Sequence, residues 1–228
     1  MTTPLKLTAH IHGAVAYNRD EGLPIDGALC YHAALERLGE RFFDPPDNDT
    51  LARESATPDP DCGLATYEIA GTWVYRASLA EIHGDHGTEI HHWNKRIDEP
   101  MLAHLVDRGA LKPRRVQLGA GEFKSYHQPV YSEIVERLVW YVEGDERRIR
   151  ELVPRIRALG KKRGTGGGRV LRWEIEPHDV PDRWLYREDG ALARSMPLDS
   201  AEAWEGERIL AGFRPPYWLP SNQAVCAR

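Results

Sequence analysis

The sequence predicts an α+β protein on the ferredoxin-like βαββαβ plan, with a long insertion and a C-terminal extension. Three observations support this class: an alternating apolar strand near the N-terminus, an amphipathic helix in the second half, and the order of the elements between them. The chain has 228 residues, of which 41% are hydrophobic, and this length suits one large domain or two small ones. We assign residues 1–176 to the ferredoxin-like domain, with inserts at about 40–63 and 83–130, and residues 177–228 to an extension packed on the same domain.

The plan opens with a strand and a helix. Apolar and polar residues alternate over residues 5–11, as in a half-buried strand. Asp26 is positioned to cap an amphipathic helix that ends at Gly39. The following stretch, residues 40–63, holds four prolines and seven acidic residues, which predicts a loop or a poorly ordered insert.

A hairpin and a long insert come next. Residues 64–69 and 72–82 are rich in β-branched and aromatic side chains on either side of Gly71, which is typical of a hairpin. Residues 83–129 show no sustained periodicity and are expected to be irregular, with a possible short helix around residues 101–106.

The second half of the plan is a strand, a helix, a glycine-rich loop and a closing strand. Residues 137–143 are strongly apolar, and Asp145 can cap the helix that follows. That helix carries apolar residues on one face at Ile149, Leu152, Val153, Ile156 and Leu159. Pro154 should kink or split it, because proline removes a backbone donor. Residues 160–168 form the loop, and residues 169–176 alternate as the closing strand.

Composition excludes several protein classes. No run of about 18 apolar residues is present, so we expect no transmembrane helix and no membrane partner. The N-terminus lacks the basic and apolar regions of a signal peptide. The three cysteines, Cys30, Cys62 and Cys226, are odd in number and far apart, which favours a reducing cytoplasm over a disulfide scaffold. We therefore expect a cytoplasmic protein.

The charge is segregated along the chain. The formal net charge is −5, which taken alone speaks against a nucleic-acid partner. Residues 147–172, however, hold ten basic residues and one acidic residue, a net charge of +9, whereas the rest of the chain carries −14. A basic segment on an acidic body indicates an anionic partner, because the local field steers a polyanion. The alternative is a solvated helix face whose arginines pair with carboxylates elsewhere.

The loop GKKRGTGGGRV, residues 160–170, does not match the common nucleotide-binding loops. Those loops lie between a strand and the N-terminus of a helix, whereas this one follows a helix and precedes a strand. Its glycines can let backbone amides approach an anion closely, and lysine and arginine flank them. The combination suits a polyphosphate backbone, and the alternative is a flexible, basic surface turn.

Two segments resemble a known family. The segments PLKLTAHIHGAVAY…LPIDGALCYHAAL and VWYVEGDERRIRELVPRIRALGKKRGTGGGRV are similar to the RAMP superfamily of CRISPR effector proteins, over roughly residues 4–38 and 119–176. Within it the chain looks like the Cas-five subunit of type IV systems, the small subunit that caps the guide RNA. The resemblance implies an RNA-recognition-type, ferredoxin-like fold with an inserted thumb-like region. It also implies these partners: CRISPR RNA at its 5′ handle, a large subunit, repeated backbone RAMP subunits and, through the complex, target nucleic acid.

The resemblance also directs attention to two sets of RNA-binding candidates. The loop set comprises Lys161, Lys162, Arg163, Gly164, Thr165, Gly166, Gly167, Gly168 and Arg169. In such subunits an inserted hairpin projects as a thumb against the guide, and residues 83–129 are the candidate for it. Aromatic and histidine side chains there could stack on unpaired bases. The insert set comprises Trp93, Lys95, Arg96, Lys124 and Tyr126.

We expect a non-catalytic subunit without cofactor, and two further readings of the sequence stay open. Some RAMP proteins cut precursor CRISPR RNA without metal, which needs a general acid and base. His10 and His12 share one strand face, and Tyr17 and His32 follow closely, so the parts of such an endoribonuclease exist. The second is a protein-interaction subunit that makes no direct RNA contact.

A metal site is not expected. Zinc could be held by a dense group of side chains in the insert, namely His83, Asp85, His86, His91 and His92. The group lacks cysteines and the usual ligand spacing, so exposed or RNA-facing histidines explain it equally well.

Overall fold

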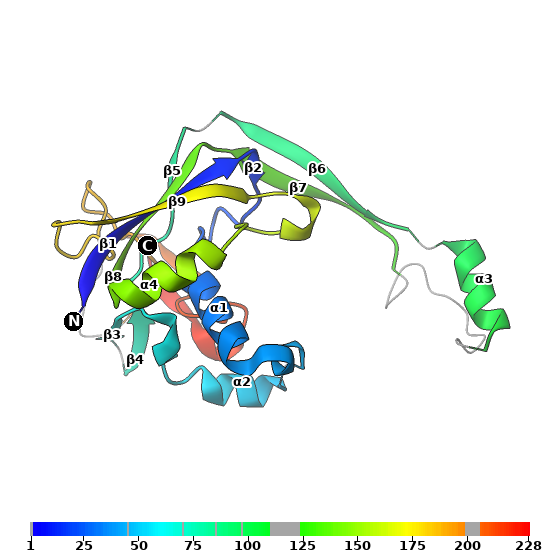
Figure 1. The fold of residues 1–228 in the computed structure, drawn as a ribbon, viewed down its shortest axis with the longest axis horizontal. Coiled ribbons are helices and arrows are strands. Elements are labelled where there is room, and N and C mark those ends of the chain that lie inside the picture. Colours follow the sequence, from blue (N-terminus) through cyan, green and yellow to red (C-terminus); the bar gives the residue numbers. More distant parts are fainter. Residues whose placement is uncertain are drawn as a thin grey trace.

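The main sheet has the strand order of a ferredoxin-like fold. The computed structural model describes residues 2–44, 46–69, 71–84, 86–96, 98–109, 124–198 and 206–228. Its four-stranded sheet is antiparallel in the order β5-β8-β1-β9 (Figure 1). The strands are β1 (Thr3–His12), β5 (Glu81–His83), β8 (Arg137–Gly144) and β9 (Arg169–Pro177). The first and third strands of the plan lie at the centre and the second and fourth at the edges. The predicted α+β, ferredoxin-like class is confirmed.

Two helices cover one face of this sheet, α1 (Asp26–Leu38) and α4 (Glu146–Leu152). The alternation predicted for the first strand is confirmed, because every second residue of β1 is buried against the helices. The shared core includes Leu5, Leu7, Ala9 and Ile11 of β1, Leu29 and Ala33 of α1, and Ile149 and Leu152 of α4. The segment that follows α4 lies next to the edge strand β9, because the Val170 amide of β9 donates to the Arg157 carbonyl at 2.9 Å.

Asp26 does not cap α1 in the way that its sequence position predicts. The N-cap residue is Ile25, and Asp26 is the first helical residue, with a fully buried side chain. Its carboxylate accepts hydrogen bonds from the Gly27 amide at 2.7 Å and from the Tyr217 hydroxyl at 2.6 Å. Burial raises the pKa of this carboxyl. Gly39 ends the helix as predicted, with a positive φ of 56°.

Pro154 ends α4 earlier than the apolar pattern suggests. The helix stops at Leu152 and tightens into a single 3-10 turn, η3 (Val153–Arg155), after which the chain is extended. The predicted split is confirmed, whereas helix as far as residue 159 is not, because proline cannot donate within the helix. Ile156 and Leu159 are nevertheless almost completely buried, since the extended chain keeps them against the core.

The acidic stretch after α1 is helical rather than a loop. It contains η1 (Gly39–Phe43), α2 (Asn48–Glu54) and η2 (Pro60–Cys62). Two of the acidic residues that suggested a loop, Asp47 and Asp59, cap helices instead. Asp47 accepts a hydrogen bond from the Thr50 amide at 2.8 Å, and this starts α2.

The predicted hairpin forms but lies outside the main sheet. It consists of β3 (Thr66–Ile69) and β4 (Thr72–Tyr75), which make a two-stranded sheet of their own. The single strand expected over residues 72–82 breaks after Tyr75. β5 joins the main sheet as a strand of three residues, and Ala77 adds an isolated bridge to Val142 of β8.

The insert forms a long antiparallel ribbon with a helix at its end. β6 (Thr88–Lys95) pairs with β7 (Tyr126–Ile134), and α3 (Glu99–Asp107) lies beyond β6. We call β6, α3 and β7 the thumb, and Figure 1 shows it projecting from the body. The short helix is confirmed, whereas the irregular structure expected here is wrong for the ribbon. Seven of the eight β6 residues are exposed. Because neither face of this strand is buried, its sequence does not alternate between apolar and polar residues.

The last fifty residues add a second apolar cluster. They contain β10 (Met196–Pro197), β11 (Arg208–Gly212), η5 (Pro220–Asn222) and β12 (Gln223–Ala227). Trp184, Met196 and Phe213 pack there with Ile69 and Val74 of the β3–β4 hairpin. Within the described part of the chain, every helix is too short or too polar to cross a membrane.

Candidate nucleic-acid interface

The glycine-rich loop is anchored at both ends of its base. We call residues 160–169 the basic loop. The Gly168 amide donates to the Ala14 carbonyl at 2.8 Å and the Lys161 amide to the Ala16 carbonyl. Gly168 has a φ of +66°, and a Cβ there would collide with the Leu159 carbonyl oxygen. Gly160 is similarly confined by Ala16. The sequence needs glycine at these two positions for the close approach of backbones.

The tip of the loop, in contrast, is open. Among the described residues, no heavy atom lies within 4 Å of a Cβ built on Gly164 or Gly166, and Gly167 meets only the Ala14 carbonyl oxygen, at 3.7 Å. The tip contains a short 3-10 turn, η4 (Arg163–Thr165), and Lys162 before it has a left-handed φ of 56°. A ligand could therefore reach the backbone of Gly164 without displacing any described side chain.

Three cations of the basic loop, and Arg157 just before it, form no ion pair with a carboxylate among the described residues. The three loop cations are Lys161, Arg163 and Arg169, and they are exposed, as is Arg157. Arg157 was not among the sequence candidates. Arg157 lies beside the basic loop because its carbonyl accepts a hydrogen bond from the Val170 amide at 2.9 Å, which holds it next to the start of β9. A cross-loop backbone contact of this kind leaves no sequence signal.

Arginines on α4 behave differently. Arg147 and Arg150 pair with Glu151 and Glu146 at 3.0 and 2.8 Å, one helical turn away. Arg148 and Arg155 reach across to Glu36 of α1 at 2.9 and 3.3 Å. Hydrogen bonding from Arg148, above all, lowers the pKa of the Glu36 carboxyl. The helical part of the basic segment therefore matches the expectation of paired surface arginines, and the loop does not.

The two predicted sets of residues meet at one point. The Lys162 ammonium lies over the Trp93 ring of β6, 4.2 Å from the ring centroid, which is a cation–π contact. The Trp93 indole nitrogen donates to the Tyr126 hydroxyl at 2.8 Å, and Tyr126 lies opposite Lys95 in the ribbon. Lys162, Trp93, Lys95 and Tyr126 therefore belong to one continuous surface.

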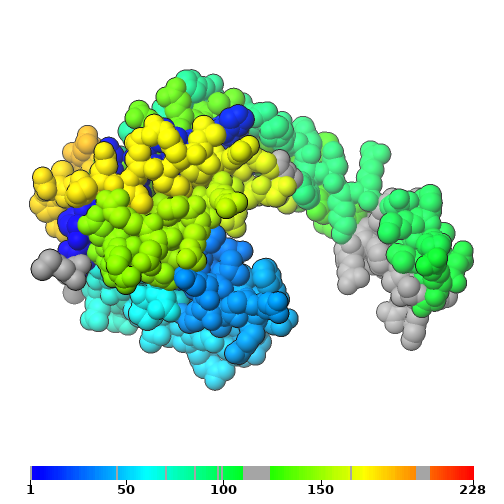
Figure 2. All heavy atoms as spheres, viewed as in Figure 1, coloured from blue at the N-terminus to red at the C-terminus, as the bar shows by residue number. Residues whose placement is uncertain are grey.

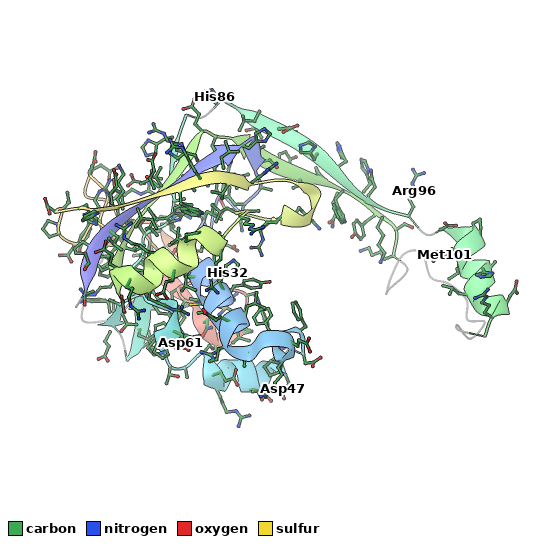
Figure 3. The ribbon with its side chains drawn as sticks, in the orientation of Figure 1. His32, Asp47, Asp61, His86, Arg96 and Met101 are labelled. Atoms are coloured by element: carbon green, nitrogen blue, oxygen red, sulfur yellow. The ribbon has the colours of Figure 1, made fainter. Side chains whose placement is uncertain are left out.

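Not every candidate lies in this surface. Figure 3 places Arg96 far along the thumb, towards Met101 of α3. Lys124 is exposed and stands two residues before β7, at the same end of the ribbon. Figure 2 shows a hollow between the thumb and the body, bordered on the body side by the blue surface of α1 and η1, with the yellow-green loop at its upper rim. Arg96, on the thumb, lies across this hollow from the body.

His32 of α1 has a positive environment beside the loop. Burial, followed by the charges of Arg155 and Arg163, lowers the pKa of this imidazole from its usual 6.5. The free protein therefore keeps His32 neutral at neutral pH. An anion bound there would favour the protonated form.

The histidines considered for RNA cleavage have different surroundings. The Nε2 atom of His10 lies 3.2 Å from a Glu174 oxygen, and the Arg172 guanidinium contacts the same carboxylate. His12 is exposed at the end of β1. The sequence alone could not pair His10 with Glu174, because β9 supplies the carboxylate from far along the chain.

The histidines of the suggested zinc group likewise have separate contacts. His86 pairs with Glu136 at 3.0 Å, His91 with Glu89 at 2.9 Å, and His92 stacks on His127 with 4.3 Å between ring centroids. Asp85 lies outside the described residues. Among the residues that the structure does describe, no group of three or more possible ligands is placed to hold a metal ion.

Comparison with known proteins gives one family. A family model described as "CRISPR type IV associated protein Csf3" matches residues 3–227 of the chain, which is nearly its whole length. No curated protein matches the sequence.

Proposed function

The chain belongs to the CRISPR type IV associated family Csf3, and we propose that it is a non-catalytic RNA-binding subunit of a type IV effector ribonucleoprotein. In this proposal the basic loop binds phosphates at the 5′ handle of the guide RNA, and the thumb lies along the adjacent nucleotides. The more specific assignment to the Cas-five group of the RAMP superfamily, together with backbone and large subunits as partners, is part of the same proposal.

One observation carries the proposal: Lys161, Arg163 and Arg169 are exposed without an ion-pair partner among the described carboxylates, and the backbone at Gly164 and Gly166 between them is open. A phosphate chain needs positive charge and reachable amides at the same place. The contact between Lys162 and Trp93 adds an aromatic ring next to those charges. Single-stranded RNA is commonly bound by this combination of cations and stacking rings.

The test compares two pairs of cations of equal charge. We expect Lys161→Ala with Lys162→Ala to weaken binding of a single-stranded handle RNA by roughly tenfold at low salt. The log–log salt slope should become shallower by about 0.7 for each phosphate that the protein no longer neutralises. Binding is measured by fluorescence anisotropy at several salt concentrations, and a length-matched RNA of unrelated sequence tests whether the handle itself is read.

Arg147→Ala with Arg150→Ala is the matched control. It removes the same charge from the same basic segment, but from arginines that already pair with Glu151 and Glu146. We expect it to change the affinity by less than about twofold. Equal effects of the two double variants would show that only net charge matters. A wild-type affinity that does not depend on salt would contradict phosphate binding altogether.

We also propose that the chain does not cleave this RNA. The competing function, a metal-independent endoribonuclease, would depend on His10 and His12, and the 3.2 Å contact between His10 and Glu174 is the observation in its favour. Incubation of the full chain with a repeat RNA in chelator should leave the RNA intact. Cleavage that leaves a 2′,3′-cyclic phosphate and disappears in His10→Ala or His12→Ala would overturn the non-catalytic assignment.

A further inference from the structure

A ladder of aromatic rings lies on the body beside the basic loop. Tyr31 of α1 packs edge to face against Phe42 of η1 with 4.9 Å between ring centroids, and Phe42 packs in the same way against Phe43 at 5.7 Å. Tyr31 is 37% exposed and Phe43 is 71% exposed. Part of each ring is therefore accessible to a ligand, and Phe42 fixes the position of both.

The end of the ladder at Tyr31 is the positive end. The Arg163 guanidinium of the basic loop lies 5.8 Å from the centroid of the Tyr31 ring. Arg155 and His32 lie in the same neighbourhood, because the charges of Arg155 and Arg163 both act on His32, and Arg155 also pairs with Glu36 at 3.3 Å, so Arg163 supplies the unpaired positive charge there. A ligand on Tyr31 would therefore have its own negative charge next to Arg163.

The end at Phe43 has the opposite character. Asp44 follows Phe43 directly, and Glu40 lies three residues before it, on the same side of a 3-10 helix. All three side chains are exposed. The two carboxylates outnumber the one cation of this turn, Arg41, so a polyanion that follows the ladder is favoured at Tyr31 and opposed at Phe43.

We propose that Tyr31 is a stacking site for one unpaired base of the single-stranded RNA whose phosphates contact the basic loop. The inference rests on the proposed function and extends it to the body side of the hollow. Every base offers an apolar face, and an exposed ring next to a cation accepts it without regard to sequence. The nucleotide on Tyr31 has its phosphate at Arg163, and Trp93 provides the corresponding ring on the thumb side of the loop.

The experiment places a fluorescent base at the site. Single-stranded RNAs of about ten nucleotides carry 2-aminopurine at one position each, and stacking on a ring quenches its emission. With the full wild-type chain we expect one position to be quenched on binding. Tyr31→Ala should abolish that quenching and weaken binding by about 5- to 100-fold, the usual effect of removing the ring under one stacked base. The salt slope should stay unchanged, because no charge is removed.

Two further variants act as controls. Tyr31→Phe keeps the ring and should preserve both the quenching and the affinity. Phe43→Ala removes a more exposed ring from the same ladder and should have no effect, since carboxylates flank it. Circular dichroism checks that each variant is folded.

The outcomes separate this inference from the proposed function. If Tyr31→Ala binds RNA like the wild type while Lys161→Ala with Lys162→Ala binds weakly, the stacking site is overturned and the RNA-binding function stands. If Tyr31→Phe is as weak as Tyr31→Ala, the hydroxyl rather than the ring makes the contact, and stacking is overturned as well. If Tyr31→Ala binds RNA normally but no longer joins its protein partners, the ladder is a protein-docking surface. If the loop variant also binds normally, the proposed function itself is wrong.

Discussion

The two halves of the basic segment carry similar charge and differ in what that charge can do. On α4, Arg147 and Arg150 are neutralised by glutamates one turn away, and Arg148 is held by Glu36 of α1. In the basic loop, Lys161 and Arg163 are exposed without a described carboxylate beside them. A count of +9 over residues 147–172 therefore overstates the charge that is available to a partner. What attracts a polyanion is the local field that remains after neighbouring pairs are formed.

Helical geometry explains the difference. Residues three or four apart on a helix are neighbours, so an arginine and a glutamate at that spacing meet without any further structure. A glycine-rich loop has no such repeat and contains no acidic residue between residues 152 and 173. Each surface ion pair on α4 contributes little to stability. The pairs do, however, reduce the positive charge with which that surface could bind an anion.

The largest expected effect is a loss of stability from a substitution at the base of the basic loop. This base holds the loop in the conformation that exposes its cations, in contrast to the paired arginines of α4. Gly168→Ala places a Cβ against the Leu159 carbonyl at a positive φ, and we expect it to destabilise the protein by about 2–4 kcal/mol. Gly164→Ala meets no described heavy atom within 4 Å and should change stability by less than about 0.5 kcal/mol. Denaturant unfolding of both variants measures the difference.

The same pair of variants also tests the open tip. If backbone near Gly164 approaches phosphate, Gly164→Ala should weaken RNA binding although its stability is unchanged. A Gly164→Ala protein that is both stable and fully active in RNA binding would show that side-chain charge alone makes the contact. A Gly168→Ala protein as stable as the wild type would contradict the anchored base.

Much of the fold could be predicted because its core leaves a periodic pattern. β1 alternates, α4 places Ile149 and Leu152 on one face, and Pro154 marks the break. The thumb could not be predicted as a ribbon, because an exposed ribbon has no buried face to impose alternation. The capped helix α2 was missed for another reason. Its acidic residues fit both a loop and a helix start, and only the position of Asp47 decides between them.

The site was predictable in composition but not in geometry. Loop residues such as Lys161 and Gly164 could be selected from local charge and glycine content alone. The contacts of Lys162 with Trp93 and of Arg163 with Tyr31 join segments that are distant in sequence, and they depend on how the thumb and α1 are placed. Local sequence also could not distinguish arginines that pair with carboxylates from arginines that are free to bind an anion, because Glu36, the partner of Arg148, comes from a different helix.

The smallest expected effect is a pH dependence of RNA affinity. It tests the basic loop and not α4, because it arises from His32 beside the loop. In the free protein, burial and the charges of Arg155 and Arg163 hold the pKa of His32 below 6.5. A phosphate beside Arg163 raises that pKa, so the complex binds more protons than the free protein between the two pKa values. By linkage, RNA affinity must rise as the pH falls through this window, whose lower edge is the pKa of the free protein, below 6.5.

A single partly buried charge contact changes affinity by about 1.5- to 5-fold. His32→Gln keeps a polar side chain without this titration, and it should remove that part of the pH dependence. The other histidines, such as His92 and His127 on the thumb, are the same in both proteins, so their contributions cancel in the comparison. The measurement is RNA affinity at pH 5.5 and 7.5 for the wild type and the variant. Identical pH profiles would place the bound phosphates away from His32, and hence away from the side of the loop that faces α1.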